Sequence, residues 1–196
     1  MGFDFKKDPF ENFLDLYREA QVKGIPDPHA MSLATVNAEN KPSVRIVYYK
    51  GMIRGGFSFF TNYNGRKAHD IEANPNVAVN FFWSHFDRQV RIEGAVQKTT
   101  REESEKYFAT RARISQLGAW TSHQSEKLES FATFEKEFAE VEAKYAGKTV
   151  PCPPHWGGYL IEPREFEFWF GRAGRLHERY IYTKVGPDWV RSLRSP

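Results

Sequence analysis

Four cationic side chains in the first half of the sequence are placed where they could bind an anion: Arg45, Lys50, Arg66 and Lys67. Arg66 and Lys67 follow an Asn-Gly turn, so the pattern predicts that they occupy the first turn of a short helix. Free N–H groups and the helix dipole already make this end positive, so further cations are unfavourable there unless an anion binds. A phosphate group would satisfy both the charges and the N–H donors. The sequence therefore predicts a phosphate-bearing small molecule at this turn.

Tyr107, Arg111 and Ser115 form a second group of candidate ligands. Their spacing of four residues places all three on one face of a helix, if a single helix continues through them. Their hydroxyl and guanidinium groups donate hydrogen bonds and suit phosphate oxygens. The alternative is an ordinary, partly solvated helix face, and spacing alone does not decide between the two.

A third group, Arg175, His177 and Arg179, alternates along a segment that follows a glycine-containing turn. Alternation along a strand would place the three side chains on one face, where they repel one another unless they converge on an anion. The alternative is a basic edge strand that opposes aggregation. His177 is also a candidate acid or base, since the charge of histidine changes near neutral pH.

Several enzyme classes are disfavoured by motifs that the sequence lacks. It contains no GxGxxG segment opening a helix, no P-loop, no HExxH and no GxSxG elbow. The histidines have no metal-ligand spacing, so no metal site is expected. Gln89, Gln124, Ser125 and Trp169 lie near strand ends or loops, and each by itself is more typical of a structural residue.

Length and composition are those of one soluble domain: 196 residues, 40% hydrophobic and 27% charged. No apolar run approaches the roughly 20 residues that span a bilayer, and the N-terminus lacks a secretory segment. Cys152 is the only cysteine, which excludes an internal disulfide. We therefore expect a cytoplasmic protein. The net charge of +3 does not demand a nucleic-acid partner, although basic residues interleaved with aromatics leave a single-strand binder as an alternative.

The candidate residues must be positioned by a β-rich scaffold. Apolar alternation predicts strands near residues 31–37, 43–50, 57–61, 77–83 and 88–97, with further strand-like segments from 158 to the C-terminus. Short links favour an antiparallel meander or barrel, mainly β with peripheral helices, in a single domain over residues 1–196. Helices are predicted over 8–23, 66–73, 101–113 and 125–145. The last should have a buried stripe formed by Leu128, Phe131, Phe134, Phe138, Val141 and Tyr145.

Seven segments occur together in an order typical of one enzyme family. They are RIVYYK, FFTNYNGRKAHDIEANP, RQVRIEG, YFATRARISQLGAWTSHQS, HWGGY, EFEFW and RLHERYIY. Over nearly the whole chain they resemble the pyridoxamine (pyridoxine) 5′-phosphate oxidase family. The resemblance implies an antiparallel FMN-binding split β-barrel, FMN as the cofactor, and a homodimer with two flavin sites built across the subunit interface.

The resemblance also implies roles for individual residues. The implied FMN-binding residues are Arg45, Ile46, Val47, Lys50, Phe60, Thr61, Arg66, Lys67, Gln89, Gln124, Ser125, Trp169 and Arg179. The implied substrate-binding residues are Lys50, Tyr107, Arg111, Ser115, Arg175, Leu176 and His177, with Arg175 and His177 as catalytic residues. Lys50 belongs to both sets. On a strand its side chain would point to the face opposite to that of Arg45, which favours the substrate-binding role.

The implied reaction is the oxidation of pyridoxamine or pyridoxine 5′-phosphate to pyridoxal 5′-phosphate, with O2 as acceptor and H2O2 as product. Alternatives on the same fold are a non-catalytic flavin or pyridoxal-phosphate binding module and a phenazine-pathway-like flavin oxidase. The phenazine branch is expected to lack counterparts of Lys50 and the RKAH run, so their presence favours the vitamin pathway. The chain departs from the family pattern at Phe60, Glu178 and Ala112-Arg113-Ile114, where the family often has Tyr, Asp and Pro-Arg-Asp.

Overall fold

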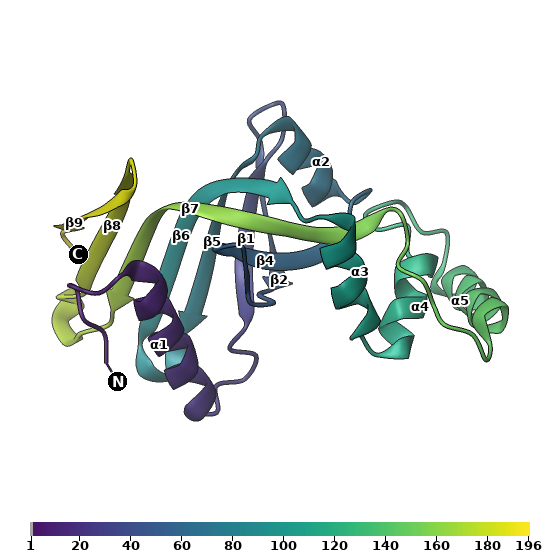
Figure 1. Cartoon of the computed structure of the whole chain (residues 1–196), viewed down its shortest axis with the longest axis horizontal. Helices are drawn as coiled ribbons and strands as arrows, with labels where there is room; N and C mark the ends of the chain where they lie inside the picture. The colour runs from purple at the N-terminus through teal and green to yellow at the C-terminus, as the bar shows by residue number, and fades with distance from the viewer. Residues whose placement is uncertain (1) are drawn as a thin grey trace.

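A long antiparallel sheet organises the molecule in a computed structural model, which describes residues 2–196. The strand order is β2-β1-β5-β6-β7-β4-β3, with β8 pairing to β7 and β9 pairing to β8. Strand β7 is the long central strand of this sheet (Figure 1). It pairs with β6 along one edge, whereas its other edge is divided between β4 near its start and β8 near its end. This division opens the sheet into two arms.

The elements follow one another with short connections. The strands are β1 (Ala30–Val36), β2 (Pro42–Tyr48), β3 (Met52–Ile53), β4 (Gly56–Asn62), β5 (Asn76–Trp83), β6 (Arg88–Lys98), β7 (Trp156–Phe170), β8 (Glu178–Val185) and β9 (Asp188–Leu193). The helices are α1 (Pro9–Val22), α2 (Arg66–Ala73), α3 (Arg101–Ala109), α4 (Arg113–Thr121) and α5 (Phe131–Tyr145), with short 3₁₀ turns η1 (Ser84–Phe86) and η2 (Ala173–Arg175). None of the helices described is long and apolar enough to cross a membrane.

Helix α1 covers the core side of the sheet, as its apolar spacing predicts. Asp8 caps the helix by accepting a hydrogen bond from the Phe10 amide, and a proline occupies its first turn. The buried ring of Phe13 packs edge-on against Phe57, with ring centroids 4.7 Å apart. The preceding residues also pack here, because the Phe5 ring lies 5.0 Å from that of Tyr180. The N-terminal segment thus lies along β8, away from helices α3 to α5 (Figure 1).

The other face of the sheet is partly apolar and exposed. Strand register aligns Ile46, Ser32, Asn80, Arg91 and Glu167 in one row across five strands. At its outer end this face exposes large side chains: Val44, Ile46 and Phe82 are 68%, 59% and 56% exposed. Among the described strands, β2 pairs with β1 alone, so it forms an edge. An apolar edge of this kind is typical of a surface that another chain covers.

Two helix predictions are wrong. The segment 101–113 is not one helix, because α3 ends at Ala109 and α4 begins at Arg113. The hydroxyl of Thr110 turns back to the Tyr107 carbonyl at 2.7 Å, and the Gln116 side chain donates to the Phe108 carbonyl at 3.0 Å. These bonds satisfy carbonyl groups that a continuing helix would have used.

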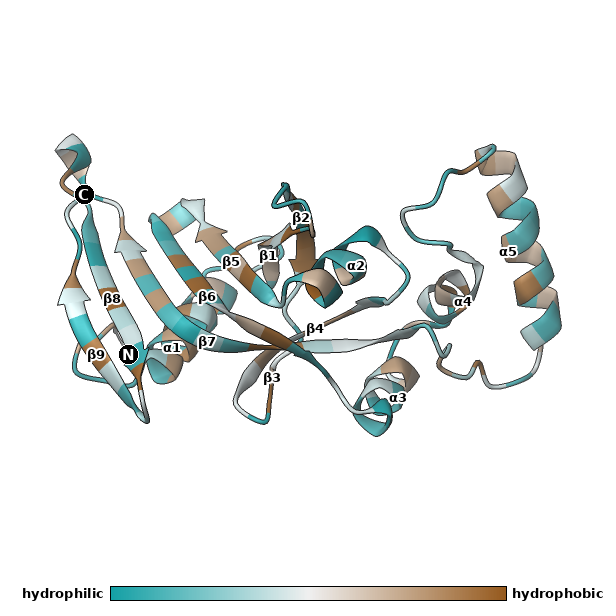
Figure 2. Cartoon of the chain, turned by 90° about the horizontal axis from the view of Figure 1, so that it is seen from above, coloured by the Kyte–Doolittle hydropathy of each residue, from teal (hydrophilic) through white to brown (hydrophobic). Residues whose placement is uncertain are grey.

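Helix α5 begins at Phe131, six positions later than predicted, because Ser130 caps it by accepting from the Thr133 amide at 3.0 Å. Its apolar stripe is not buried either. Leu128 and Phe131 are 46% and 80% exposed, and only Tyr145 of the stripe is buried. The helix stands beyond α4 at one end of the molecule, where the sheet does not reach it (Figure 2).

Candidate active site

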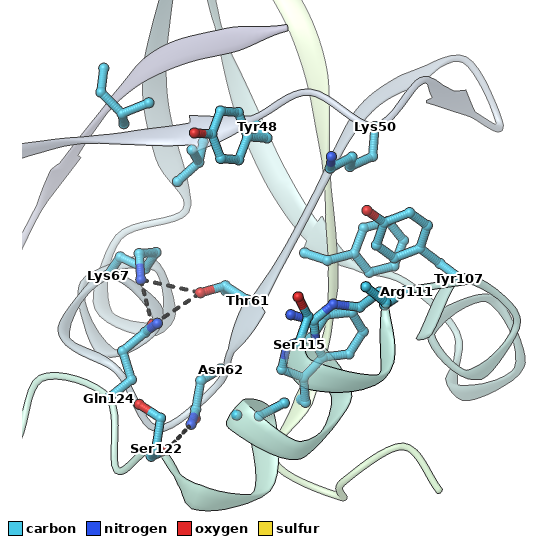
Figure 3. Close-up of a pocket in the computed structure, with 17 residues that line it drawn as sticks. Tyr48, Lys50, Thr61, Asn62, Lys67, Tyr107, Arg111, Ser115, Ser122 and Gln124 are labelled. Atoms are coloured by element: carbon cyan, nitrogen blue, oxygen red, sulfur yellow. Dashed lines mark hydrogen bonds between the residues drawn. The ribbon is translucent and has the colours of Figure 1, made fainter. Parts of the chain in front are cut away.

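A cavity of about 640 Å³ lies where α2, α3 and α4 meet the ends of β2 and β4. Its volume is in the range of small-molecule sites. Ten of the predicted site residues line it: Ile46, Val47, Lys50, Phe60, Thr61, Lys67, Tyr107, Arg111, Ser115 and Gln124. Figure 3 shows Lys67, Thr61 and Gln124 on one side of this cavity and Tyr107, Arg111 and Ser115 on the other. The cavity therefore has two separate polar corners.

The first corner is built around Lys67, in the first turn of α2. Its Nζ atom donates to Gln124 Oε1 at 2.6 Å and to Thr61 Oγ1 at 3.1 Å (Figure 3). Burial lowers the pKa of Lys67, and the charge of Arg45 lowers it further. Its partners are neutral oxygens, so among the described residues the ammonium group forms no ion pair. An anion entering this corner would supply the missing charge.

Arg45 lies behind this corner and does not line the cavity. Its guanidinium donates to Thr35 Oγ1 at 2.7 Å and to Ser43 Oγ at 2.5 Å. The Asp70 carboxylate lies 3.7 Å away and accepts from both hydroxyls. Burial lowers the pKa of Arg45, Asp70 opposes the shift, and Arg66 adds to it. Three cations thus influence one another around a single buried carboxylate, which leaves this corner positive.

The start of α2 packs closely against the loop that follows α4. The Arg66 amide donates to Ser125 Oγ at 3.2 Å, while the N-cap position is Gly65, which has no side chain to cap the helix. A Cβ atom at Gly65 would lie 2.7 Å from Gln124 Oε1, so a larger residue would displace the oxygen that binds Lys67. Ser125 has a left-handed backbone, with φ of 74°. Such strain at a non-glycine residue is often found at ligand-binding sites.

The second corner contains Tyr107, Arg111 and Ser115. They come from the end of α3, the link between the helices and the first turn of α4, rather than from the single helix that was predicted. The structure nevertheless brings the three residues together, because all of them line the cavity. Arg111 Nη1 is buried and has no hydrogen-bond partner among the described residues. Burial lowers the pKa of Arg111. A buried guanidinium with a free donor indicates a site for an anion.

Another set of predicted site residues lies outside this cavity, on β6, β7 and β8. Gln89, Trp169 and Arg179 are direct neighbours across β6, β7 and β8, so they form one row. Arg179 donates to both carboxylate oxygens of Glu167, at 2.7 and 3.0 Å. The His177 ring packs on Trp169, with centroids 4.6 Å apart.

The predicted strand face of Arg175, His177 and Arg179 is wrong. Strand β8 begins only at Glu178, so the first two residues lie in the preceding turn. Arg175 has a left-handed backbone, with φ of 60°, which is incompatible with a strand. The Arg172 amide donates to His177 Nδ1 at 3.1 Å and fixes this turn. His177 and Arg179 both lie next to Trp169, so strand alternation is not what brings them together.

Seven residues that line the cavity were not predicted as site residues: Tyr48, Asn62, Ala112, Gly118, Ala119, Ser122 and Trp156. All seven lie inside segments that had already been singled out: Tyr48 in RIVYYK, Asn62 in FFTNYNGRKAHDIEANP, Trp156 in HWGGY, and the other four in YFATRARISQLGAWTSHQS. Tyr48 shares the strand parity of Ile46, so alternation could have found it. The residues of α4 and its two caps had no spacing signal of their own, because a helix beginning at Arg113 was not predicted.

Comparison with known proteins gives the family. A model described as pyridoxamine 5′-phosphate oxidase matches residues 17–145, and one described as the pyridoxine 5′-phosphate oxidase C-terminal dimerisation region matches residues 156–196. The chain belongs to the pyridoxamine 5′-phosphate oxidase family. It is accordingly an FMN-dependent oxidase, and its C-terminal part is a dimerisation region. The predictions of family, cofactor and enzyme class are confirmed.

Individual relatives agree with this assignment. Pyridoxine/pyridoxamine 5′-phosphate oxidase of Bdellovibrio bacteriovorus is 51% identical, over 99% of this chain and 100% of its own length. The enzyme of the same name from Leptospira biflexa is also 51% identical, over 96% of this chain and 89% of its own.

Solved structures show the fold. PhzG from Burkholderia lata, in complex with tetrahydrophenazine-1-carboxylic acid, has a TM-score of 0.92 at 27% identity and covers 96% of this chain and 93% of its own. An FMN-binding protein related to pyridoxamine 5′-phosphate oxidase, from Nostoc punctiforme, has a TM-score of 0.77 at 14% identity, over 97% and 100% of the two chains. The predicted antiparallel split barrel is thereby confirmed.

Proposed function

We propose that the protein oxidises pyridoxamine 5′-phosphate and pyridoxine 5′-phosphate to pyridoxal 5′-phosphate, with O2 as the electron acceptor and H2O2 as the product. The observation that supports this proposal best is one cavity with two separate cationic corners. A cofactor and a substrate that each contain a phosphate group require such a pair. The names of relatives about 51% identical over nearly the whole chain point to the same reaction.

The Lys67 corner fits the phosphate of FMN. It combines an ammonium group that lacks an ion pair among the described residues, two further cations, and a glycine-dependent close approach at the start of a helix. In this proposal Arg45, Arg66, Lys67, Gln124 and Ser125 hold the phosphate. The residues Ile46, Val47, Phe60 and Thr61 extend along the cavity wall beside the rest of the cofactor. FMN, when bound, accepts the hydride that leaves the substrate.

The Arg111 corner fits the phosphate of the substrate. Arg111, Tyr107 and Ser115 supply N–H and O–H donors from three consecutive segments, and the exposed Lys50 side chain lies above them (Figure 3). Such a cluster binds a dianion through charge-assisted hydrogen bonds. By anchoring one end of the substrate, it fixes the position of the opposite end, where oxidation takes place.

The remaining predicted residues are proposed to come from a second subunit. Gln89, Trp169 and Arg179 would complete the flavin site, and Arg175, Leu176 and His177 would cover the substrate. Among the described residues of one chain, none of these six lines the cavity. They belong to the sheet face that exposes Phe82 or to the turn beside it, and the C-terminal part of this family is a dimerisation region. A homodimer with flavin at its interface would unite the two halves.

Arg175 and His177 are proposed to act on the substrate itself. Arg175 would orient the ring and stabilise negative charge near the reacting substituent. His177 Nδ1 accepts the Arg172 amide, so a neutral imidazole has its proton on Nε2. That N–H is then available to donate a hydrogen bond to the substrate. We further propose that the chain acts as one domain, because the larger of its two core clusters unites residues as distant as Phe13 and Tyr182, and the smaller one includes Trp156 at the start of β7 in the same sheet.

Oxygen consumption tests the proposed function. The purified protein, saturated with FMN, should consume O2 and release H2O2 with pyridoxine 5′-phosphate, and more slowly or not at all with unphosphorylated pyridoxine. The similarity to PhzG motivates one rival substrate, a reduced phenazine carboxylic acid. Turnover of that compound without turnover of pyridoxine 5′-phosphate would contradict the proposal. The lower identity to PhzG, 27% against 51%, favours the vitamin substrate.

A further inference from the structure

We propose that Trp156 is a positioning residue for the substrate phosphate. Its indole face holds the Arg111 guanidinium by stacking, so that the guanidinium N–H groups stay available for the anion. Trp156 opens β7 and lines the cavity beside Arg111. The inference rests on the proposed function, because it takes Arg111 as a ligand of the substrate phosphate.

The contacts of Arg111 differ from those of the arginines that form ion pairs. Its Cζ atom lies 4.7 Å from the ring centroid of Trp156 and 5.5 Å from that of Phe108. Among the described residues it has no carboxylate within salt-bridge distance, and its buried Nη1 has no hydrogen-bond partner. Arg101, in contrast, donates to Glu105 and to the Pro153 carbonyl, and Arg179 donates to Glu167.

Stacking has a consequence that hydrogen bonding does not have. A guanidinium donates in its own plane, whereas a stacked ring contacts it from above or below. An aromatic partner therefore fixes the position of the cation without occupying its donors. A carboxylate partner would occupy two donors and would also neutralise the charge that attracts a phosphate. Burial lowers the pKa of Arg111, because it removes water from around the cation. The stacked ring remains as a favourable neighbour of that charge.

Trp156 itself is held firmly enough to act as a platform. Its ring is nearly parallel to those of Phe60 and Tyr107, at interplanar angles of 14° and 6°. Phe108 closes the edge of the ring at a centroid distance of 5.0 Å. The Trp156 amide donates to the Pro153 carbonyl at 3.1 Å, and the side chain is buried. The ring on which Arg111 lies is thus itself packed on several sides.

The test compares Trp156→Leu and Trp156→Phe with the control Trp120→Leu. Trp120 belongs to the same region and stacks with Lys144, but it does not line the cavity. The probe is pyridoxal 5′-phosphate, titrated into the FMN-loaded protein by absorbance, with unphosphorylated pyridoxal in parallel. Trp156→Leu should weaken pyridoxal 5′-phosphate binding about 2- to 30-fold, and Trp156→Phe should weaken it less, because a smaller ring retains part of the interaction. Pyridoxal binding, FMN affinity and the control should be unchanged.

A double-mutant cycle with Arg111→Ala decides whether Trp156 acts through the arginine. Once Arg111 is absent, Trp156→Leu should cause no further loss. Additive losses, or an equal loss for pyridoxal, would overturn the positioning role while leaving the proposed function intact. If Arg111→Ala itself leaves pyridoxal 5′-phosphate binding unchanged, the assignment of the substrate-phosphate corner is wrong instead. Should the leucine variant not fold, Trp156→Phe in the same cycle gives the same decision.

Discussion

Trp156 and Trp169 lie on the same strand, β7, thirteen positions apart, and each belongs to a different half of the proposed site. An extended strand rises about 3.3 Å per residue, so the two indoles are on the order of 40 Å apart. Trp156 lines the cavity, whereas Trp169 stands in the row with Gln89 and Arg179. No single chain with a continuous β7 can bring both tryptophans to one flavin.

Mixing two inactive variants tests whether the site spans two subunits. Lys67→Met breaks the half that contains the cavity, and Arg179→Ala breaks the half on β8. In a heterodimer of the two, one site contains both changes and the other contains neither. Random exchange of subunits should therefore restore about a quarter of the wild-type activity. Activity that stays at the level of the separate variants, with exchange verified by mass, would argue that each site belongs to one chain.

Arg111→Ala should raise KM for pyridoxine 5′-phosphate about 10- to 150-fold, because one hydrogen-bonded charge contact with the phosphate is lost. FMN content and kcat at saturation should change little, since the arginine lies in the corner away from Lys67. Arg113→Ala is the matched control. That arginine donates to the Tyr145 and Lys148 carbonyls and does not line the cavity. Loss of FMN with an unchanged KM would reverse the assignment of the two corners.

Lys67→Met should weaken FMN binding by a similar factor, about 10- to 150-fold, measured by the quenching of flavin fluorescence. The methionine keeps the length of the side chain but removes the ammonium group that points into this corner of the cavity. Lys98→Met serves as control, because Lys98 lies on the surface and pairs with Glu72 of α2. Equal FMN affinity for both variants would remove Lys67 from the cofactor site.

Glu167→Gln should destabilise the fold near neutral pH by about 3 kcal/mol, because the 2% exposed carboxylate is paired with Arg179, Arg91 and Arg194. Burial raises the pKa of Glu167, but hydrogen bonding and charge from Arg179 and its neighbours outweigh burial and the net pKa is lowered. The unfolded value is about 4.3. The stabilisation is therefore complete above that pH and is lost as pH falls through the lower folded value.

Urea unfolding of wild type and Glu167→Gln at pH 7 and at pH 3 checks this prediction. The difference between the two proteins should be large at pH 7 and should shrink at pH 3. Glu165→Gln is the control, because Glu165 is partly exposed and its one ion pair among the described residues is with Arg194. A difference that stays constant across this range would show that the charge of Glu167 does not stabilise the fold.

Local signals were sufficient where the chain folds on itself over a short distance. Apolar alternation predicted the central strands to within one or two residues, and the Asn-Gly turn correctly placed Arg66 and Lys67 at the start of α2. Lys67 and Thr61 of the first corner follow from these elements, because β4, the turn and α2 are consecutive, whereas Gln124 comes from the loop after α4. The part of the site that could be predicted is thus the part that adjacent residues build.

The second corner was predicted for the wrong structural reason. Nothing in the residues around Thr110 breaks a helix strongly, and the break depends on Gln116, which reaches back to α3. A proline occurs at the position of Ala112 in the family pattern and would have marked the boundary. The apolar spacing of α5 likewise suggested burial, because periodicity reports a stripe but not the surface that covers it. The turn before β8 was not predicted, because it depends on the hydrogen bond between the Arg172 amide and His177.

The exposed edge strand affects how variants of this protein will behave in a cell. In the proposed homodimer, a subunit that has not found its partner would present Val44 and Ile46 on an edge strand, which is a template for aggregation. Substitutions that weaken dimer assembly should therefore reduce the amount of soluble protein before they reduce turnover per folded molecule. A monomeric protein would be expected to have charged side chains, lysine above all, on such an edge. In the proposed homodimer, the apolar residues found here would instead make solubility depend on assembly.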